Sequence, residues 1–166
     1  MPFARPLLAV LSLAACAPAA PAATPAPAFD PLAFFSGRTE GTATLKIVLR
    51  AARAVRVEGT GRVEGDGTLV LDQIVRQEGK PATRRQWRIR RTGPGRYAGT
   101  LSDAVGPIAG EVTGDRLHLS FTMKGGLRTD QWLALSADGR SASNLLTARK
   151  FGVVVARLDE TIRKLD

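Results

Sequence analysis

From Gly37 onward the chain alternates between apolar and polar side chains, and this period of two residues is the feature that most limits the fold. Successive side chains of a β-strand point to opposite faces of the sheet, so the alternation predicts strands with one buried face. The clearest apolar face consists of Leu117, Leu119, Phe121 and Met123. Polar side chains occupy the positions between them, which indicates a half-buried strand.

Turn signals separate these segments about every ten residues. They are Gly65-Asp66-Gly67, Gly93-Pro94-Gly95, Gly106-Pro107, Gly114-Asp115, Gly125-Gly126 and Asp138-Gly139. Glycine and aspartate tolerate the positive φ angles of tight hairpins, so many short antiparallel strands are expected. The pattern predicts an all-β domain, a small antiparallel barrel or sandwich of about 8–10 strands. Closure is favoured because a closed sheet leaves no open edges.

The C-terminal segment allows two interpretations. Leu158, Ile162 and Leu165 have the spacing of one helix face, whereas residues 151–155 resemble a buried strand. No other part of the domain predicts a helix.

The N-terminus carries a short apolar run, residues 7–13, which is too short to span a bilayer. It leads into Leu13-Ala14-Ala15-Cys16, which resembles a bacterial lipobox. The resemblance implies a signal peptide over residues 1–15, a diacylated Cys16, and a lipid-anchored protein of the bacterial envelope. Residue 17 is Ala and not Asp, so the outer membrane facing the periplasm is expected. The alternative is an ordinary signal peptide that is cut further along and discards Cys16.

Residues 16–28 form the lipidated cysteine and an Ala/Pro-rich linker, and residues 29–166 form one domain. Loss of Arg5 with the leader leaves 23 of the 24 Lys and Arg against 15 Asp and Glu, a net charge of +8. Such a charge favours anionic envelope partners, including lipid headgroups, although a merely solvated basic surface explains it equally. Few aromatic side chains are present to stack bases, so no nucleic-acid partner is expected.

Catalytic and metal-binding motifs are missing from the sequence. His118 is the only histidine and lies on the polar face of its strand. We therefore expect no metal, no cofactor and no catalytic residues. A hydrolase that uses carboxylates remains the weakest alternative, in which Asp103, Asp115 and Asp130 meet at a barrel mouth, or in which Ser102 acts with Asp103.

The densest basic patch surrounds Trp87. Arg84, Arg88 and Arg90 share one face of this strand. Arg85 and Arg91 share the opposite face with Trp87. An arginine row can hold phosphates with paired hydrogen bonds, although such a run is often only a solvated face.

An ordered set of short motifs resembles an uncharacterised family of bacterial lipoproteins classed as a domain of unknown function. The motifs are the lipobox, Phe34-Phe35-x-Gly37, Trp87-Arg88-Ile89, Tyr97-x-Gly99-Thr100-x-x-Asp103-x-x-Gly106, Asp130-x-Trp132, Asn144 and Lys150-Phe151-Gly152-Val153. The resemblance spans most of residues 29–162 and implies location and a β-rich domain, but no reaction. The expected architecture is also similar to lipocalin-type barrels, which hold one apolar ligand.

The leading hypothesis is a non-enzymatic, envelope-anchored protein whose barrel binds a lipid or another amphipathic ligand. The side chains expected to line the interior are Trp87, Tyr97, Leu119, Phe121 and Trp132. Those expected to orient the polar end of the ligand are Arg88, Asp103 and Arg128. The alternative is a structural or protein-interaction module of the envelope with a packed core.

Overall fold

The computed structural model describes residues 27–166, and Cys16 with the predicted leader and most of the linker lies outside them. One short helix precedes ten strands, which confirms the all-β prediction. The elements are α1 (Pro31–Phe35), β1 (Gly37–Ile47), β2 (Arg53–Val63), β3 (Leu69–Gln77), β4 (Thr83–Gly93), β5 (Arg96–Leu101), β6 (Ile108–Thr113), β7 (Arg116–Met123), β8 (Leu127–Leu135), β9 (Ser141–Lys150) and β10 (Val153–Lys164).

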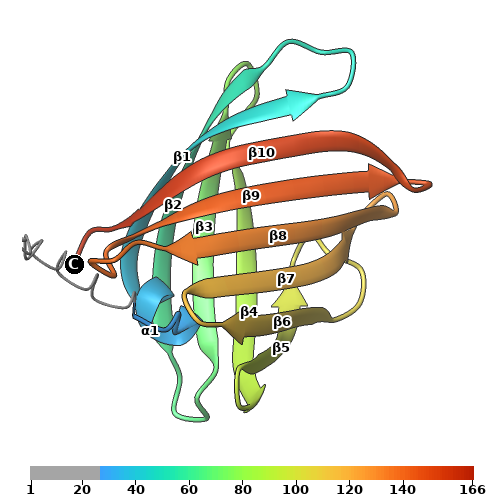
Figure 1. Cartoon of the computed structure of the whole chain (residues 1–166). Helices are drawn as coiled ribbons and strands as arrows, with labels where there is room; N and C mark the ends of the chain where they lie inside the picture. Colours follow the sequence, from blue (N-terminus) through green and yellow to red (C-terminus); the bar gives the residue numbers. More distant parts are fainter. Residues whose placement is uncertain (1–26) are drawn as a thin grey trace, which may run out of the picture.

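The ten strands form a closed antiparallel barrel (Figure 1). Each strand pairs with its sequence neighbour, and β1 pairs with β10 from Thr39↔Lys164 to Ile47↔Ala156 to close the sheet. The predicted closure is therefore confirmed. No helix among residues 27–166 is long and apolar enough to cross a membrane.

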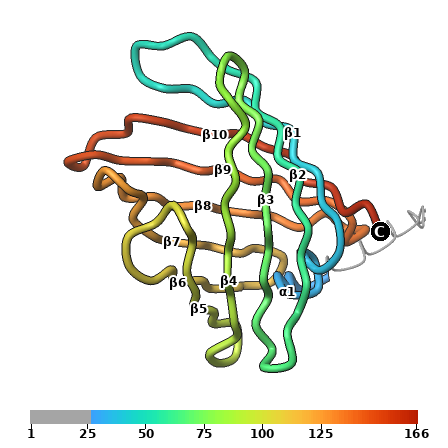
Figure 2. The backbone as a smooth tube through the Cα atoms, turned by 180° about the vertical axis from the view of Figure 1, so that it is seen from behind, coloured from blue at the N-terminus to red at the C-terminus, as the bar shows by residue number. Residues whose placement is uncertain are grey.

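Antiparallel order places the connections alternately at two ends of the barrel (Figures 1 and 2). One end, which we call the closed end, holds α1, the C-terminus and the turns after β2, β4, β6 and β8. The other, which we call the open end, holds the connections after β1, β3, β5, β7 and β9. These two names are kept below.

Helix α1 plugs the closed end. Asp30 caps it, accepting hydrogen bonds from the backbone N–H groups of Leu32 and Ala33, and Pro31 fits the first turn because it needs no N–H partner there. Phe34 and Phe35 point into the barrel. A Cβ on Gly61 of β2 would lie 1.8 Å from the carbonyl oxygen of Phe35, so a glycine is required for the helix to approach the sheet.

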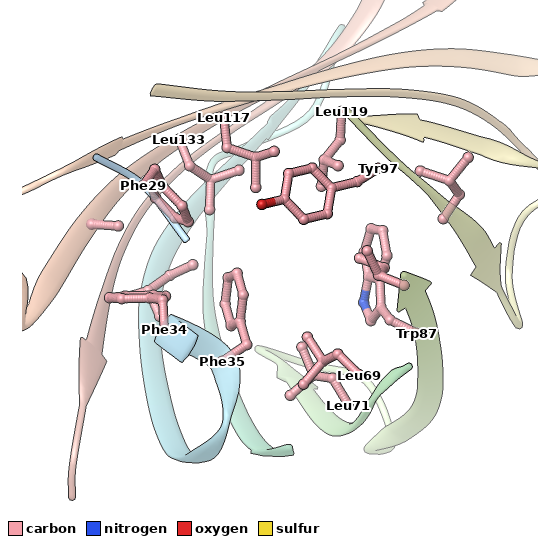
Figure 3. Packing of buried hydrophobic residues seen from close by; sticks show 14 of the residues in the cluster. Phe29, Phe34, Phe35, Leu69, Leu71, Trp87, Tyr97, Leu117, Leu119 and Leu133 are labelled. Carbon is pink, nitrogen blue, oxygen red and sulfur yellow. The ribbon is translucent and has the colours of Figure 1, made fainter. Parts of the chain in front are cut away.

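The main apolar core fills the half of the barrel next to this plug and continues along β5, β6 and β7 to Leu101, Ile108 and Phe121 near the open end (Figure 3). Aromatic rings of α1 face Leu69, Leu71 and Trp87, and Tyr97, Leu119 and Leu133 close the opposite wall. A smaller cluster of Ala43, Val55 and Val57 lies towards the open end. Packing near the open end is looser along β1, β3, β9 and β10, where Leu45, Val75, Leu146 and Leu158 are only half-buried.

The C-terminal segment was open to two interpretations, and residues 153–164 are a strand that completes the barrel between β1 and β9. Residues 153–155 begin this strand as predicted, but they are exposed or half-buried. Phe151 and Gly152 form the β9–β10 turn, and Phe151 is 94 % exposed. The five-residue helix α1 was not expected, and its role as a plug explains why its side chains are apolar.

Candidate ligand-binding site

Polar side chains form a layer across the interior, between the main core and the open half. They come from β1, β3, β4, β8, β9 and β10, and the layer consists of Thr39, Gln73, Arg85, Gln131, Asn144 and Glu160. Each has the inward parity of its strand, in register with apolar core residues. Buried polar groups are costly unless they find partners, so their arrangement indicates a specific use of this layer.

Gln73 organises one side of the layer. Its Oε1 atom accepts hydrogen bonds from Arg85 Nε and from Trp87 Nε1, both at 2.8 Å. The guanidinium of Arg85 also lies 5.8 Å from the centre of the Trp87 ring. These contacts fix the charged group of Arg85 inside the barrel, and burial lowers its pKa, although the charges of Glu160 and Asp103 act in the opposite direction.

Glu160 of β10 provides the opposite charge. It is only 6 % exposed and accepts a hydrogen bond of 2.7 Å from Asn144 Nδ2. A Cβ on Gly41 of β1 would lie 2.0 Å from Glu160 Oε1, so the glycine makes room for the carboxyl group. Burial raises the pKa of Glu160, while the Asn144 hydrogen bond and the charge of Arg85 partly offset this rise.

A cavity of about 30 Å³ separates Arg85 from Glu160. Both side chains line it together with Gln73, Gln131, Trp87 and Leu119. Its volume suits one small polar group or water molecule. Arg85 and Glu160 form no direct ion pair within the described part of the chain, so a bound polar group can hydrogen-bond to both of them.

Two buried acceptor atoms in the layer have no hydrogen-bond partner within the described residues. They are Gln131 Oε1, in the wall of the cavity, and Asn144 Oδ1, next to Glu160. An unpaired buried acceptor costs about 1–3 kcal/mol. The layer therefore has unused hydrogen-bonding capacity, and a donor group entering the interior can satisfy it.

Beyond the layer, the inward-facing wall is apolar and half-buried. Its members are Leu45, Val75, Leu146 and Leu158. Leu158 pairs across the sheet with Leu45 on one side and Leu146 on the other, which makes a continuous aliphatic strip. Since these side chains point into a barrel and still contact solvent, the open half is accessible from outside.

The larger hollows are grooves on the outer surface. One of about 520 Å³ lies over β2, β3 and β4 and is lined by exposed polar groups including Glu58, Asp72 and Gln86, and its lining also includes Gln73 and Arg85 of the polar layer. Gln86 Nε2 donates to Asp72 Oδ1 at 2.8 Å, so this surface satisfies part of its own hydrogen bonding. The interior layer has the stronger features of a binding site, namely buried charges and unpaired acceptors.

The prediction that Trp87, Tyr97, Leu119 and Phe121 line the interior is confirmed. The edge of Trp87 meets the Phe121 ring at a centroid distance of 5.5 Å. Tyr97 has its pKa raised by burial, and Arg91 lies 5.5 Å from the centre of its ring. The alternation of β4, β5 and β7 was sufficient to place these side chains.

The predictions for three other residues are wrong. Trp132 is 49 % exposed on the outer face of β8, because Thr129, Gln131 and Leu133 take the inward positions of that strand. Arg88 also faces outward and pairs with Glu64 at 2.8 Å. Arg128 is exposed on the same outer side as Trp132.

Asp103 lies in the β5–β6 connection at the open end, half-buried, where it accepts a hydrogen bond of 3.1 Å from Ser102 Oγ. Its backbone oxygen accepts from the N–H of Lys124 at 2.8 Å, which ties two neighbouring turns together. Asp103 is therefore at the rim of the barrel, whereas the sequence suggested an inward-facing polar anchor.

The three aspartates of the hydrolase alternative do not converge. Asp103 is at the open end, Asp115 is in the β6–β7 turn at the closed end, and Asp130 is on the outer face of β8. Asp130 Oδ1 lies 3.2 Å from His118 Nε2, and its other oxygen accepts from Arg149 Nη1 at 2.8 Å. His118 stacks on Trp132 at 4.0 Å, so the histidine belongs to an outer-surface cluster.

Sequence reasoning placed Arg85 on the Trp87 face but missed Gln131, Asn144 and Glu160 as site residues. The available signal was parity, since Glu160 lies two residues from both Leu158 and Ile162 and must share their face in a strand. Because the segment could also be read as a helix, the strand parity of Glu160 was not used. Residues 27–166 contain no group of three or more His, Cys, Asp or Glu side chains placed to hold a metal ion.

The fold and its interior define a small lipocalin-like barrel. The chain belongs to the family described as "Protein of unknown function (DUF3833)", whose match spans residues 10–164. A comparison with curated proteins found no match.

Two solved structures share the architecture. The S-type phycobiliprotein lyase CPES from Guillardia theta superposes with a TM-score of 0.62 at 5 % identity, covering 81 % of this chain and 90 % of the lyase. Rv2717c from M. tuberculosis superposes with a TM-score of 0.62 at 19 % identity, covering 81 % of this chain and 95 % of the other. At these identities the likeness shows the fold alone.

Proposed function

We propose that this protein is a non-enzymatic carrier or sensor that binds one small amphipathic molecule inside its barrel. The observation that carries the proposal is the interior polar layer, in which Arg85 and Glu160 face a shared cavity beside the unpaired Gln131 Oε1. A barrel that needed only stability would gain from apolar residues at these positions, because burying separated charges is costly.

The polar end of the ligand lies between Arg85 and Glu160. A group with both an acceptor and a donor, such as a hydroxyl or a protonated acid, accepts from the guanidinium and donates to Glu160 or Gln131. Gln73 holds Arg85 in place for this contact through the 2.8 Å hydrogen bond. Hydrogen bonds to charged groups contribute about 1.5–3 kcal/mol, enough to orient a ligand.

The apolar part of the ligand extends towards the open end, along the half-buried strip of Leu45, Leu146 and Leu158. Each methylene group moved from water to this strip contributes about 0.8 kcal/mol. A fatty acid or another single-chain lipid has this combination of one polar group and one apolar chain.

The location proposed for this activity is the bacterial envelope, with the protein anchored through a diacylated Cys16 and facing the periplasm from the outer membrane. The sequence support is the lipobox-like Leu13-Ala14-Ala15-Cys16 and the lack of Asp at residue 17. Two acyl chains are sufficient for stable anchoring. A barrel near a membrane has lipids as its nearest amphipathic ligands.

Tryptophan fluorescence tests the interior site, because Trp87 lies inside and Trp132 outside. The full chain with Trp132→Phe retains only Trp87 as an emitter. Titration with a bromine-labelled long-chain fatty acid, below the concentration at which it forms micelles, is expected to quench Trp87 with a saturable curve. Arg85→Met should raise the dissociation constant obtained from this curve about tenfold, since it removes one charged contact with the ligand.

The matched control is Arg88→Met, which changes the neighbouring arginine on the outer face of the same strand. It should leave the quenching curve unchanged. If Trp87 of the folded protein shows no saturable quenching, or if both arginine variants bind alike, the proposed site is wrong. Circular dichroism of each variant establishes that the barrel is folded before titration.

A further inference from the structure

Large apolar side chains are exposed on three connections of the open end. We call this set the apolar rim, and its members are Val48, Leu49, Val105, Phe151 and Val153. Leu49 is 100 % exposed and Phe151 is 94 % exposed. Exposed apolar groups gathered at one place on a protein surface mark an interaction site.

The backbone of the rim strengthens this interpretation. Leu49 and Phe151 are the two residues other than glycine with positive φ in the described chain, at 61° and 51°. Bulky side chains are disfavoured in this conformation, and neither side chain gains packing in return. Both residues are unfavourable for the isolated fold, so the apolar tips have a use outside it.

Two of the three connections of the rim are joined directly, and the third lies on the same end of the barrel. The N–H of Val48 donates to the carbonyl of Val155 at 3.0 Å, which joins the β1–β2 connection to the start of β10 beside Phe151. The N–H of Val105 donates to the carbonyl of Thr122 at 2.7 Å, so the third connection is held against β7. Figures 1 and 2 show these connections gathered around the same end of the barrel.

Basic side chains surround the rim. The exposed ones on or next to the connections of the open end are Lys46, Arg50, Arg53, Lys80, Lys124 and Lys150. None of them forms an ion pair within residues 27–166. The connections at this end contribute only two acidic residues, Glu78 and Asp103.

The closed end has a mixed charge. Its turns, cap and C-terminal residue contribute Asp30, Glu64, Asp66, Asp115, Asp138 and Asp166, and the exposed basic side chains on or next to the same connections are Arg38, Arg62, Arg96, Arg116, Arg140 and Arg163. Some of these charges pair, as in Arg38 with Asp166 and Arg91 with Asp30. The excess of positive charge is therefore at the open end, and an anionic surface attracts that end more strongly.

We propose that the open end docks on an anionic lipid bilayer. Leu49 and Phe151 insert at the boundary between headgroups and acyl chains, and the surrounding lysines and arginines contact lipid phosphates. This combination of apolar tips within a basic ring fits a bilayer, which offers both an apolar layer and a charged surface. The proposal stands independently of whether the interior holds a ligand.

Docking in this orientation places the barrel mouth against the membrane and the N-terminal connection away from it. Phe29, where the described chain begins its contacts, hydrogen-bonds through its N–H to Gly114 at the closed end, at 2.9 Å. Attachment through the N-terminus and docking through the rim thus predict membrane contact at opposite ends of the barrel. Labels at the two ends distinguish them.

Cys16 is the only cysteine in the chain, so Cys16→Ser provides a background for single labels. In this full-length background, Phe151→Cys marks the open end and Ala137→Cys, in the exposed β8–β9 turn, is the matched control at the closed end. Each cysteine carries a polarity-sensitive fluorophore. The probe is a vesicle of equimolar phosphatidylcholine and phosphatidylglycerol.

The expected result is a blue shift of the label at position 151 with the anionic vesicles, and a much smaller shift at position 137. Adding Lys80→Glu and Lys124→Glu should weaken vesicle binding at least about tenfold, because two attractive charges become repulsive. Leu49→Ser should weaken binding by about the same factor, since the apolar tip is lost.

Three outcomes would overturn the proposal: no shift at position 151, a shift confined to position 137, or equal shifts with pure phosphatidylcholine. The second means that the closed end, and not the apolar rim, contacts the bilayer. The fatty-acid titration is read at Trp87 inside the barrel and the vesicle experiment at the rim, so failure of one does not imply failure of the other.

Discussion

The two ends of this barrel are built from the same ten strands but differ in almost every other respect. Turns of the closed end place glycine at the positive-φ positions, as at Gly67, Gly95, Gly114 and Gly139, and a helix covers the interior. The open end also has glycines at positive φ, as at Gly79, Gly106 and Gly125, but there Leu49 and Phe151 take the same backbone conformation with exposed side chains. The closed end is arranged for stability, whereas the open end has exposed apolar side chains in an unfavourable backbone conformation, which only contact with a binding partner would stabilise.

The interior repeats this difference. Near α1 it is packed with aromatic and aliphatic side chains, and near the open end the inward positions of β1, β3, β9 and β10, such as Leu45, Val75, Leu146 and Leu158, are half-buried. The polar layer around Arg85 and Glu160 separates these halves. Mutations in the two halves should therefore have unequal effects, which makes the comparison testable.

The largest expected effect is at Leu133, which is almost fully buried in the main core. Leu133→Ala should lower the free energy of unfolding by about 3 kcal/mol, because the packed side chains around it cannot close the cavity. Leu146→Ala, the matched change in the open half, should cost about 1 kcal/mol. Urea denaturation measures both, and equal losses would show that the two halves are packed alike.

Glu160, at the boundary between the halves, should give an intermediate effect that depends on pH. Burial raises its pKa above 4.5, so the folded state favours the protonated form. The shifted pKa of Glu160 therefore adds to the free energy of unfolding below pH 4.5, where the carboxyl group is protonated. This contribution is lost as the pH rises through the folded-state pKa and the buried group becomes charged. Glu160→Gln, which mimics the protonated acid, should be more stable than the unmodified chain at pH 7 by about 1 kcal/mol.

Urea titrations across this pH range should show the difference between the two proteins shrinking towards acidic pH. Exposed carboxylates whose pKa is lowered, such as Asp66 and Asp138, change the stability of both proteins equally with pH. They therefore cancel in the difference between the two proteins. A less stable Gln variant at pH 7 would indicate that the Arg85 charge compensates the burial of Glu160.

The smallest effect is expected at the rim. Leu49→Asn should raise the free energy of unfolding by about 0.5 kcal/mol, because asparagine tolerates positive φ and no packing is lost. Val48→Asn, at a neighbouring position without positive φ, should leave stability unchanged. A loss of stability at Leu49→Asn would show that this side chain supports the fold.

Much of the fold could be predicted because alternation and turn residues are local signals. Trp87, Tyr97 and Phe121 were placed inside correctly from the pattern of their own strands. The C-terminal strand was ambiguous for a simple reason, since Leu158 and Ile162 are four residues apart. That spacing keeps two side chains on one face in a strand as well as in a helix.

The site was harder to predict because β8 inverts the usual pattern. Gln131 faces inward while Trp132 faces solvent, where it stacks on His118. Hydrophobicity alone assigns these two residues to the wrong faces. The partnership of Arg85 and Glu160 joins strands from distant parts of the chain, and only closure of the barrel brings them to one cavity.

The pairing of β1 with β10 also governs how the molecule is made. Thr39 meets Lys164, so the first strand of the domain must wait for almost the last residues to be synthesised before it finds its partner. Until then a nine-strand sheet has two unpaired edges, which invite association with other chains. Such long-range closure slows folding. Chains that lack residues 153–166, and with them all of β10, should therefore accumulate as aggregates and not as a smaller barrel.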